Sequence, residues 1–288
     1  QSDVLTTGGN GSVVIRTTNG SITLNDGTVK ADGSAGTDNT AVSAHGSGNI
    51  LIEAIGAGTS FTANADIKSG SGHITVMAVQ TATFNATADI TTGGTGTIYV
   101  EGTGGNVTQA DDSRFTAVSG DIRVVAGSTI NLGGVTTNAN ASLIAGTGSI
   151  LDSGSAFGGE DVIANTLRMK AGTGIGTSGD HMETKVGTVS ARATSGGVFM
   201  VESDALIVGD TSATVQRVTW SNGLTATIDA TQSDVLTTGG NGSIVIRTTN
   251  GSITLNDGTV KADGSTGTDN TAVSENGSGN ILIEALNA

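Results

Sequence analysis

The sequence predicts an all-β fold, a right-handed parallel β-helix with about three short strands in each coil. Three observations lead to this prediction: a glycine-rich composition, short apolar triplets at a fixed spacing, and turn-forming residues between the triplets. The 288 residues include 46 glycines, no proline and no cysteine, with only 2% aromatic and 13% charged residues. Such glycine content is typical of disordered chains, but a 35% hydrophobic content at regular intervals indicates a folded one.

A short period runs through the first half of the chain. The isoleucines Ile50, Ile74, Ile98 and Ile122 follow one another at equal intervals (74 − 50 = 24 positions), and each opens an apolar–x–apolar triplet. Alternate side chains of a strand point to the same face, so each triplet turns two apolar side chains inward. Stacked about 4.8 Å apart as a parallel ladder, the triplets place these isoleucines directly above one another in a narrow core.

A second element recurs between the triplets and begins with phenylalanine. Phe61 and Phe84 are separated by nearly the same interval (84 − 61 = 23 positions), and we expect their rings to stack. Helices are excluded because no stretch keeps apolar residues at a helical spacing over several turns. After residue 150 the period loosens, and we expect residues 161–176, 182–210 and 215–230 to continue as strands and turns of the same helix. The expected inward pairs there are Leu167 with Met169, Val198 with Met200, and Leu206 with Val208.

A long repeat encloses the short one. The opening of the chain returns at Gln232, which gives a period of 232 − 1 = 231 positions. Residues 1–57 align with 232–288 without a gap and differ at six positions. Residues 1–231 are therefore one complete solenoid unit, and 232–288 begin the next unit of a continuous solenoid. About 22 residues per coil predict roughly ten or eleven coils, and a rod of about 50 Å, for each unit.

The charge balance excludes several classes of partner. The net charge is −14 and the sequence pI is about 4.3, so nucleic acid is not an expected partner. No apolar run approaches the roughly 18 residues of a membrane span, so this segment is not expected to insert into a membrane. The opening QSDVLTTGG has no signal-peptide pattern. We therefore expect these residues to be an internal excerpt of a larger protein.

Several motifs resemble the repeats of filamentous-haemagglutinin-type adhesins. They are Gly-Ser-Ile-Thr-Leu at 20–24, Gly-Asn-Ile-Leu-Ile-Glu-Ala at 48–54, Gly-Asp-Ile-Arg-Val-Val-Ala at 120–126, and the stretch at 167–176. The resemblance implies a right-handed β-helical shaft that is extracellular or on a bacterial cell surface. The family's N-terminal secretion domain has no counterpart here, and the long period exceeds the family's usual repeat.

The expected function is that of a structural and adhesive shaft segment in a very large tandem-repeat protein. Its expected partners are other cell surfaces or extracellular glycans, with end-to-end self-association through exposed strands. The alternative is a polysaccharide-active or carbohydrate-binding β-helix. An enzyme is not expected, because such sites need paired carboxylates in a groove with aromatic platforms, and the chain has one tryptophan, one tyrosine and five phenylalanines.

Acidic turns are the candidate metal site. Asp26, Asp32 and Asp38 stand at even intervals of six positions, and the second unit keeps them as Asp257, Asp263 and Asp269. Carboxylate oxygens on tight turns are the ligands that Ca²⁺ uses, so calcium is the one cofactor considered. The alternative is that these residues only form turns, since Asp-Gly and Asn-Asp are common turn sequences.

The three histidines are expected to be structural. His45 becomes Asn276 in the second unit, which indicates an exposed turn. His73 occupies the outward position before Ile74 and is interpreted as a surface residue. His181 stands between Asp180 and Glu183, where a metal site is conceivable but a solvated loop is the favoured interpretation.

Overall fold

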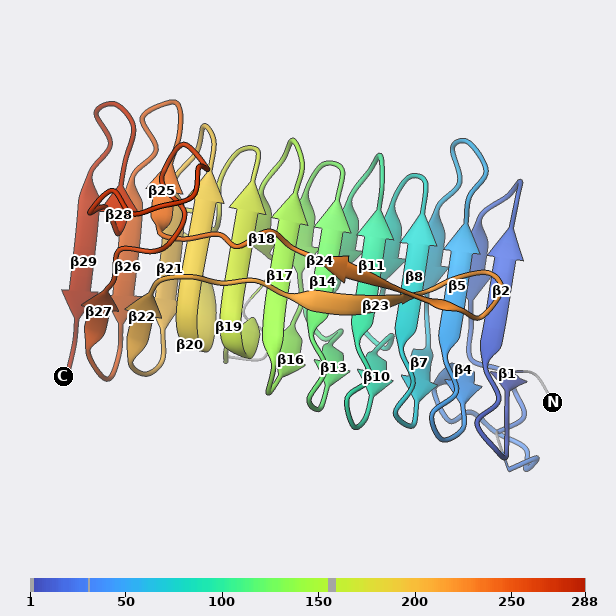
Figure 1. Ribbon diagram of the computed structural model, residues 1–288. Coiled ribbons are helices and arrows are strands. Elements are labelled where there is room, and N and C mark those ends of the chain that lie inside the picture. The colour runs from blue at the N-terminus through green and yellow to red at the C-terminus, as the bar shows by residue number, and fades with distance from the viewer. Residues whose placement is uncertain (1–2, 31, 155–158, 288) are drawn as a thin grey trace.

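The protein folds as a parallel β-solenoid, seen in a computed structural model that describes residues 3–30, 32–154 and 159–287 (Figure 1). All its regular elements within these ranges are strands, which form a 21-stranded sheet, a 6-stranded sheet and a 2-stranded sheet. The fold class expected from the sequence is confirmed. The described residues contain no helix long and apolar enough to cross a bilayer.

The strands of the first half of the chain stack in three columns. Neighbours within each column pair in parallel. The first column is β1 (Val4–Leu5), β4 (Thr40–Ala44), β7 (Asp66–Ser69), β10 (Ile90–Thr92), β13 (Phe115–Ala117) and β16 (Val135–Thr137). The second column is β2 (Val13–Thr17), β5 (Ile50–Ala54), β8 (Ile74–Ala78), β11 (Ile98–Gly102), β14 (Ile122–Ala126) and β17 (Asn140–Ala145). The third column is β3 (Ile22–Leu24), β6 (Phe61–Ala63), β9 (Ala82–Phe84), β12 (Val107–Gln109), β15 (Ile130–Leu132) and β18 (Ile150–Asp152).

The isoleucine ladder lies in the second column as predicted. Ile50 pairs with Ile74, Ile74 with Ile98, and Ile98 with Ile122, and all four side chains are fully buried. The glycine two positions before each isoleucine has a steric reason. A Cβ at Gly72 would lie 2.0 Å from the carbonyl oxygen of Gly48 in the coil below. Only glycine lets the turns of successive coils approach this closely.

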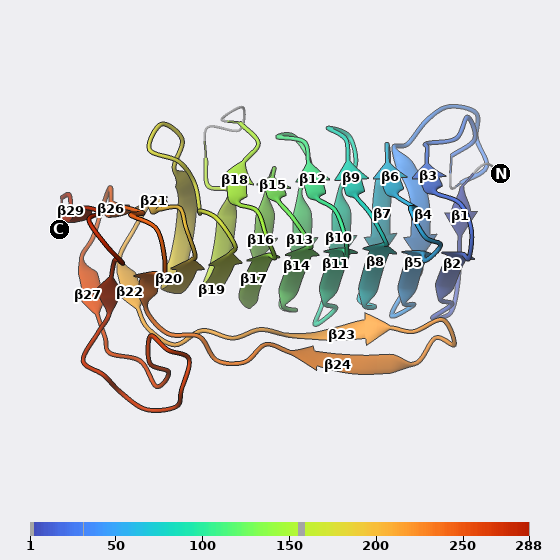
Figure 2. The same ribbon diagram turned by 90° about the horizontal axis from the view of Figure 1, so that it is seen from above.

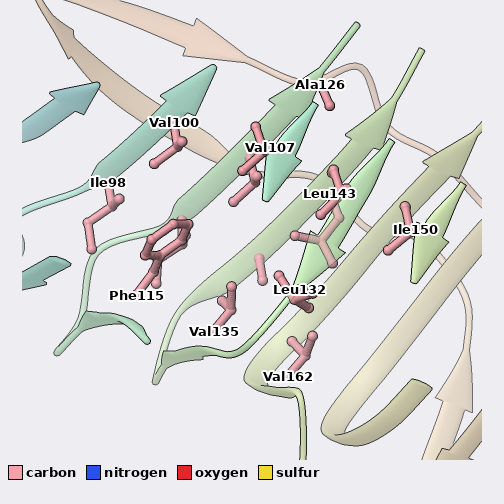
Figure 3. Packing of buried hydrophobic residues seen from close by; sticks show 14 of the residues in the cluster. Ile98, Val100, Val107, Phe115, Ala126, Leu132, Val135, Leu143, Ile150 and Val162 are labelled. Atoms are coloured by element: carbon pink, nitrogen blue, oxygen red, sulfur yellow. The ribbon is translucent and has the colours of Figure 1, made fainter. Parts of the chain in front are cut away.

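The three columns enclose one narrow apolar core. Figure 3 shows Val107, Phe115 and Leu143, one from each column, pointing into the same interior. The expected pair of Phe61 and Phe84 is confirmed, with ring centroids 5.4 Å apart, and Phe115 extends it at 4.7 Å from Phe84. The inward pairs predicted after residue 150 are confirmed, since the side chains of all six residues are at most 1% exposed.

The columns change places toward the end of the first unit. β19 (Val162–Ala171) and β20 (Met182–Ala193) are long strands that continue both the first and the second column. β21 (Val198–Glu202) then pairs with residues 182–184 of β20. Val198 of β21 also forms an isolated β-bridge with Ile175, and Ile175 forms another with Ile150 of the third column. β22 (Leu206–Val208) and β25 (Val235–Thr237) pair with residues 188–193 of β20 and so continue the second column.

The second unit therefore starts on the other side of the rod. β26 (Ile244–Thr248) is the copy of β2, yet it stacks on β21, and β29 (Ile281–Ala285) stacks on β26. β27 (Ile253–Leu255) and β28 (Val273–Ser274), the copies of β3 and β4, stack on β22 and β25. Figure 2 shows β26 and β29 on the side of β15 and β18, opposite to β8 and β11. One unit therefore contains a whole number of coils and about one half coil more.

The unit has fewer coils than predicted. The second column has eight rungs from β2 to β20, namely β2, β5, β8, β11, β14, β17, β19 and β20. One coil is long because Val13 pairs with Ile50, 37 positions later. Residues 212–231 leave the coil altogether. About eight and a half coils at about 4.8 Å each give a unit about 40 Å long.

Residues 215–230 are short strands and a turn, as expected, but they are not part of the coil. They form an antiparallel hairpin of β23 (Thr214–Val218) and β24 (Leu224–Ile228), inserted between β22 and β25. The hairpin lies along the rod and crosses its strands (Figures 1 and 2). Thr211 and Gln232 close its base with two backbone hydrogen bonds of 2.8 and 3.0 Å, so the coil continues past the insertion without a break.

Candidate functional site

Three carboxylates meet beside the long loop between β3 and β4. Asp3 lies just before β1, while Asp26 and Asp38 lie near the two ends of the loop. One carboxylate oxygen from each side chain lies within 4.8 Å of the others. These three residues are the first acidic cluster. It contains two of the three predicted aspartates, Asp26 and Asp38, together with Asp3, which the sequence analysis missed.

The backbone fixes one side of each carboxylate in the first acidic cluster. The amide of Gly27 donates to Asp3 Oδ1 at 3.1 Å, Asn39 donates to Asp26 Oδ2 at 2.9 Å, and Thr40 donates to Asp38 Oδ1 at 3.2 Å. The other oxygens of two of them, Asp3 Oδ2 and Asp26 Oδ1, are buried and have no hydrogen-bond partner in the described part of the chain. An oxygen left in this state carries a desolvation cost that a bound cation would remove.

Asp32 has a different role from the one predicted with its neighbours. It lies at the exposed tip of the loop, and its Oδ1 accepts hydrogen bonds from the amide of Ser34 at 2.9 Å and from Ser34 Oγ at 2.6 Å. These bonds lower the pKa of Asp32. Asp32 therefore forms the turn that the alternative interpretation assigned to all three aspartates.

The second unit keeps the three aspartates as Asp234, Asp257 and Asp269, but they are not among the groups of described carboxylates whose oxygens lie within 4.8 Å of one another. Asp234, the copy of Asp3, is 0% exposed, and the backbone amide of Gly258 approaches its carboxylate as that of Gly27 approaches Asp3. Burial raises the pKa of Asp234 to about 6; the amide of Gly258 acts against this shift, and the carboxylates of Asp269 and Asp257 add to it. Asp257 Oδ2 accepts from the amide of Asn270 at 2.8 Å, as Asp26 does from Asn39.

Another group of carboxylates lies further along the rod, at the end of β18 and just before β19. Oxygens of Asp152, Asp161 and Glu183 lie within 4.8 Å of one another, and the amide of Glu183 donates to Asp161 Oδ2 at 2.8 Å. Burial raises the pKa of Asp161, and the carboxylates of Asp152 and Glu183 raise it further. The Asp161 side chain hydrogen-bonds with both neighbouring carboxyl groups. We infer that the carboxyl groups of Asp152, Asp161 and Glu183 share a proton.

The shared proton predicts a pH dependence of stability. The pKa of Asp161 is higher in the folded chain than in the unfolded one, so the stabilisation is complete below the ordinary value of 3.8 and is lost as the pH rises toward the folded value. We expect Asp161→Asn to be more stable than the unchanged chain at pH 9, with the difference shrinking as the pH falls toward 3.8. Thermal melts of both proteins across this range test the prediction. Parallel curves would contradict it.

The histidines make structural contacts. His45 is exposed, with Nδ1 2.8 Å from the Gly9 carbonyl oxygen. His73 is half-buried rather than a free surface residue, because its Nδ1 lies beside the next coil and accepts a hydrogen bond from the Thr97 amide at 3.1 Å. Burial lowers the pKa of His73. The ring of His181 packs edge-on against Phe199 with centroids 5.8 Å apart.

The hairpin docks on the second column through a ladder of its own. Backbone amides at alternate positions of β23 donate to outward side chains of successive coils. The amide of Thr214 donates to Asp121 Oδ2 at 2.7 Å, Gln216 to Thr97 Oγ1 at 3.0 Å, and Val218 to Thr75 Oγ1 at 2.8 Å. Each step of two positions along β23 therefore advances one coil along the rod.

The side chains of the hairpin bury the only tyrosine of the chain. Tyr99 is 3% exposed, its hydroxyl donates to Glu101 Oε2 at 2.7 Å, and the guanidinium of Arg217 lies 4.7 Å from its ring centroid. Arg123 approaches the same ring at 5.5 Å and forms an ion pair of 2.9 Å with Asp229. The hairpin is therefore fastened by hydrogen bonds, an ion pair and cation–π contacts.

The opposite side of the hairpin is open to solvent. Leu224 and Ile228 of β24 are 47% and 70% exposed, and Trp220 near the turn is 67% exposed. Sequence reasoning assigned none of these residues to a surface feature, because the hairpin is defined by contacts with residues at least 93 positions earlier in the chain.

The fold and these surfaces define the class as a parallel β-solenoid repeat protein. No family model matches the chain, and neither a curated protein nor a solved structure matches it. The likeness to filamentous-haemagglutinin-type repeats therefore stays a prediction from the short motifs of the sequence.

Proposed function

We propose that this chain is a structural and adhesive shaft segment of a very large tandem-repeat protein, secreted or displayed on a bacterial surface. The observation that carries the proposal is the seamless junction between the two units. β26 continues the ladder from β21 with five paired residues, and β29 continues it from β26 with five more. Units joined in this way add length to one rod rather than forming separate domains.

The last described coil supports the same proposal. Ile50 in β5 is fully buried beneath β8, whereas its copy Ile281 in β29 is 46% exposed. Another coil stacked on β29 would bury this isoleucine as β8 buries Ile50. The same exposed rung supports the proposal that the segment associates end to end when no further coil covers it.

The adhesive part of the proposal follows from repetition. The outward side chains of residues 1–57 recur almost unchanged at 232–288, so a weak contact of these residues with a cell surface or an extracellular glycan would be multiplied along the shaft. The sequence motifs that resemble surface adhesins support the location. The shaft itself needs no catalytic group for this role, and we propose that the segment is not an enzyme.

The shaft is tested by measuring length against the number of units. We expect small-angle scattering of proteins with one, two and three units to show a constant cross-section and a maximum dimension that grows by about 40 Å per unit. Flexible beads with a varying cross-section would contradict a continuous shaft. Glycan arrays probed with the same three proteins test adhesion. Signals that rise steeply with unit number support it, and their absence, or cleavage of a glycan, would contradict it.

A further inference from the structure

We propose that two copies of this chain pair side by side through the outer edge of β24, so that their two hairpins join into one antiparallel sheet. This contact differs from the end-to-end association proposed above, because it uses the flank of the rod rather than its last rung. The pairing of two chains does not depend on the adhesive role.

The outer edge of β24 is an unpaired strand edge. The even-numbered residues of β23 donate their amides to the rod, so its odd-numbered residues bond to β24. The same alternation continues at the open end of the hairpin, where the amide of Asp229 donates to the Ala213 carbonyl oxygen at 2.9 Å. Leu224, Ala226 and Ile228 therefore turn their amides and carbonyls away from β23. No described strand pairs with this edge, and Figure 2 shows β23 between the rod and β24.

The edge lacks the features that normally prevent strand pairing. Exposed edge strands are usually protected by charged side chains or proline. Residues 218–228 contain neither, although the chain has a net charge of −14. The side chains of Leu224 and Ile228 are exposed on this strand, as described above. A second uncharged strand can therefore approach the edge without electrostatic repulsion.

The sequence of β24 makes a second copy of the same strand the fitting partner. It is Leu-Thr-Ala-Thr-Ile, which reads almost the same in both directions. A two-fold axis through Ala226 would place Leu224 opposite Ile228 of the second copy. It would also place Thr225 opposite Thr227. Apolar side chains then face apolar ones and threonine faces threonine, which are favourable cross-strand pairs.

The backbone groups on this edge fit the same axis. Leu224, Ala226 and Ile228 of each copy would pair with one another and exchange about six hydrogen bonds, two in each pair. A contact between identical chains that closes on itself requires this kind of two-fold symmetry. The symmetry distinguishes a second copy from an unrelated strand, which would gain the backbone bonds but not the matching side chains.

The direction of β24 determines how the rods lie. β24 runs along the rod, so antiparallel pairing would lay two rods side by side in opposite directions (Figure 1). The second unit starts on the other side of the rod, where β26 stacks on β21, so its hairpin would face the opposite way. A shaft of many units would then pair with neighbours on two opposite sides. This last step rests on the proposed tandem shaft, whereas the pairing of two chains does not.

Sedimentation equilibrium of the 288-residue chain tests the pairing. We expect a reversible dimer with a dissociation constant below about 1 mM. Ala226→Lys should weaken the dimer at least about tenfold, because it sets two like charges opposite each other at the two-fold axis. Ala226 is exposed and its amide faces away from β23, so the hairpin should keep its fold.

Ile281→Lys is the matched control. It adds the same charge to the 46% exposed last rung, where end-to-end association would occur. Both substitutions reduce the net charge of −14, so general repulsion cannot explain a weaker dimer in either variant. We expect Ile281→Lys to keep the side-by-side dimer. A monomer at about 1 mM would overturn the proposal, and so would a loss in Ile281→Lys that equals or exceeds the loss in Ala226→Lys.

A single cysteine locates the contact, because the chain has none of its own. At the two-fold axis the Cα atoms of the two copies would be about 5.5 Å apart, within the range of about 4.4–6.8 Å for a disulfide. Ala226→Cys should therefore give a covalent dimer in oxidised glutathione. Thr91→Cys, at an exposed position of β10 in the first column, should stay monomeric. Equal cross-linking of the two variants would overturn the assignment to β24.

Discussion

Phe84→Ala is expected to lower the free energy of unfolding by about 3–5 kcal/mol, the range for removing a fully buried aromatic side chain. Phe84 is 1% exposed and lies between Phe61 and Phe115, with ring centroids at 5.4 and 4.7 Å. Removing it would take away both ring contacts at once. The cavity cannot close easily, because the backbone ladder fixes the spacing of the coils on either side.

Phe199→Ala is the control for this substitution. Phe199 lies on β21 and is half-buried, with one ring contact to His181. We expect it to cost less than half as much as Phe84→Ala. Urea denaturation gives the free energies, and hydrogen exchange of β6, β9 and β12 shows whether the loss is local, since stacked coils need not unfold together. Equal losses for the two variants would contradict the role of the phenylalanine stack.

The first half of the core could be predicted from the sequence because one coil has nearly one length. Equal steps from Ile50 through Ile74 and Ile98 to Ile122 bring the same position of successive coils into register, so the sequence period and the structural period coincide. Beyond Ile122 the steps change: Ile122 pairs with Ala141 after 19 positions, and Ala141 pairs with Leu167 after 26. The half-turn between the units accumulates from such steps, which a period alone does not reveal.

The sequence at the turn of the hairpin is typical of hairpins, but the same sequence also occurs at an ordinary turn of the coil. Asn222-Gly223 stands at its turn, with Asn222 at φ 61°, and Asn-Gly between apolar runs is a strong hairpin signal. The same pair occurs at Asn19-Gly20, where the chain makes an ordinary turn between β2 and β3. Docking depends on Thr75, Thr97 and Asp121, which only the fold brings beneath β23.

The members of the first acidic cluster could likewise be predicted only in part from the sequence. The even spacing of Asp26, Asp32 and Asp38 suggested that the three act together, but a loop of this length folds back on itself. Its two ends meet while Asp32 turns outward toward Ser34. Asp3 belongs to the cluster because the fold brings the start of β1 beside the loop. Sequence spacing identified two of the three carboxylates that converge, and the path of the loop decided which side chains meet.

The hairpin is expected to control the ionisation of Tyr99. Burial, together with the neighbouring Glu101, raises the pKa of this phenol from 10.0 to about 12, although Arg217 and Arg123 act against the shift. Replacing residues 212–231 with Asn-Gly, a two-residue turn between the paired Thr211 and Gln232, should leave the rod intact and expose the ring. We expect the pKa of Tyr99 to return toward 10.0, as measured by the ultraviolet absorbance of tyrosinate.

The same shift fixes the pH range in which the hairpin detaches. The neutral phenol is favoured in the docked state, so the contribution of Tyr99 is complete below pH 10 and is lost as the pH rises through about 12. Val215→Asp with Val218→Asp places charges at the two buried positions of β23, which are 0% and 3% exposed, and should lower the pKa of Tyr99 as the deletion does. Leu224→Asp with Ile228→Asp adds the same charges to the exposed side of β24 and should leave it near 12. If both double substitutions shift the pKa of Tyr99 equally, the added negative charge rather than detachment of the hairpin explains the change. The hairpin then does not hold Tyr99 in its neutral form.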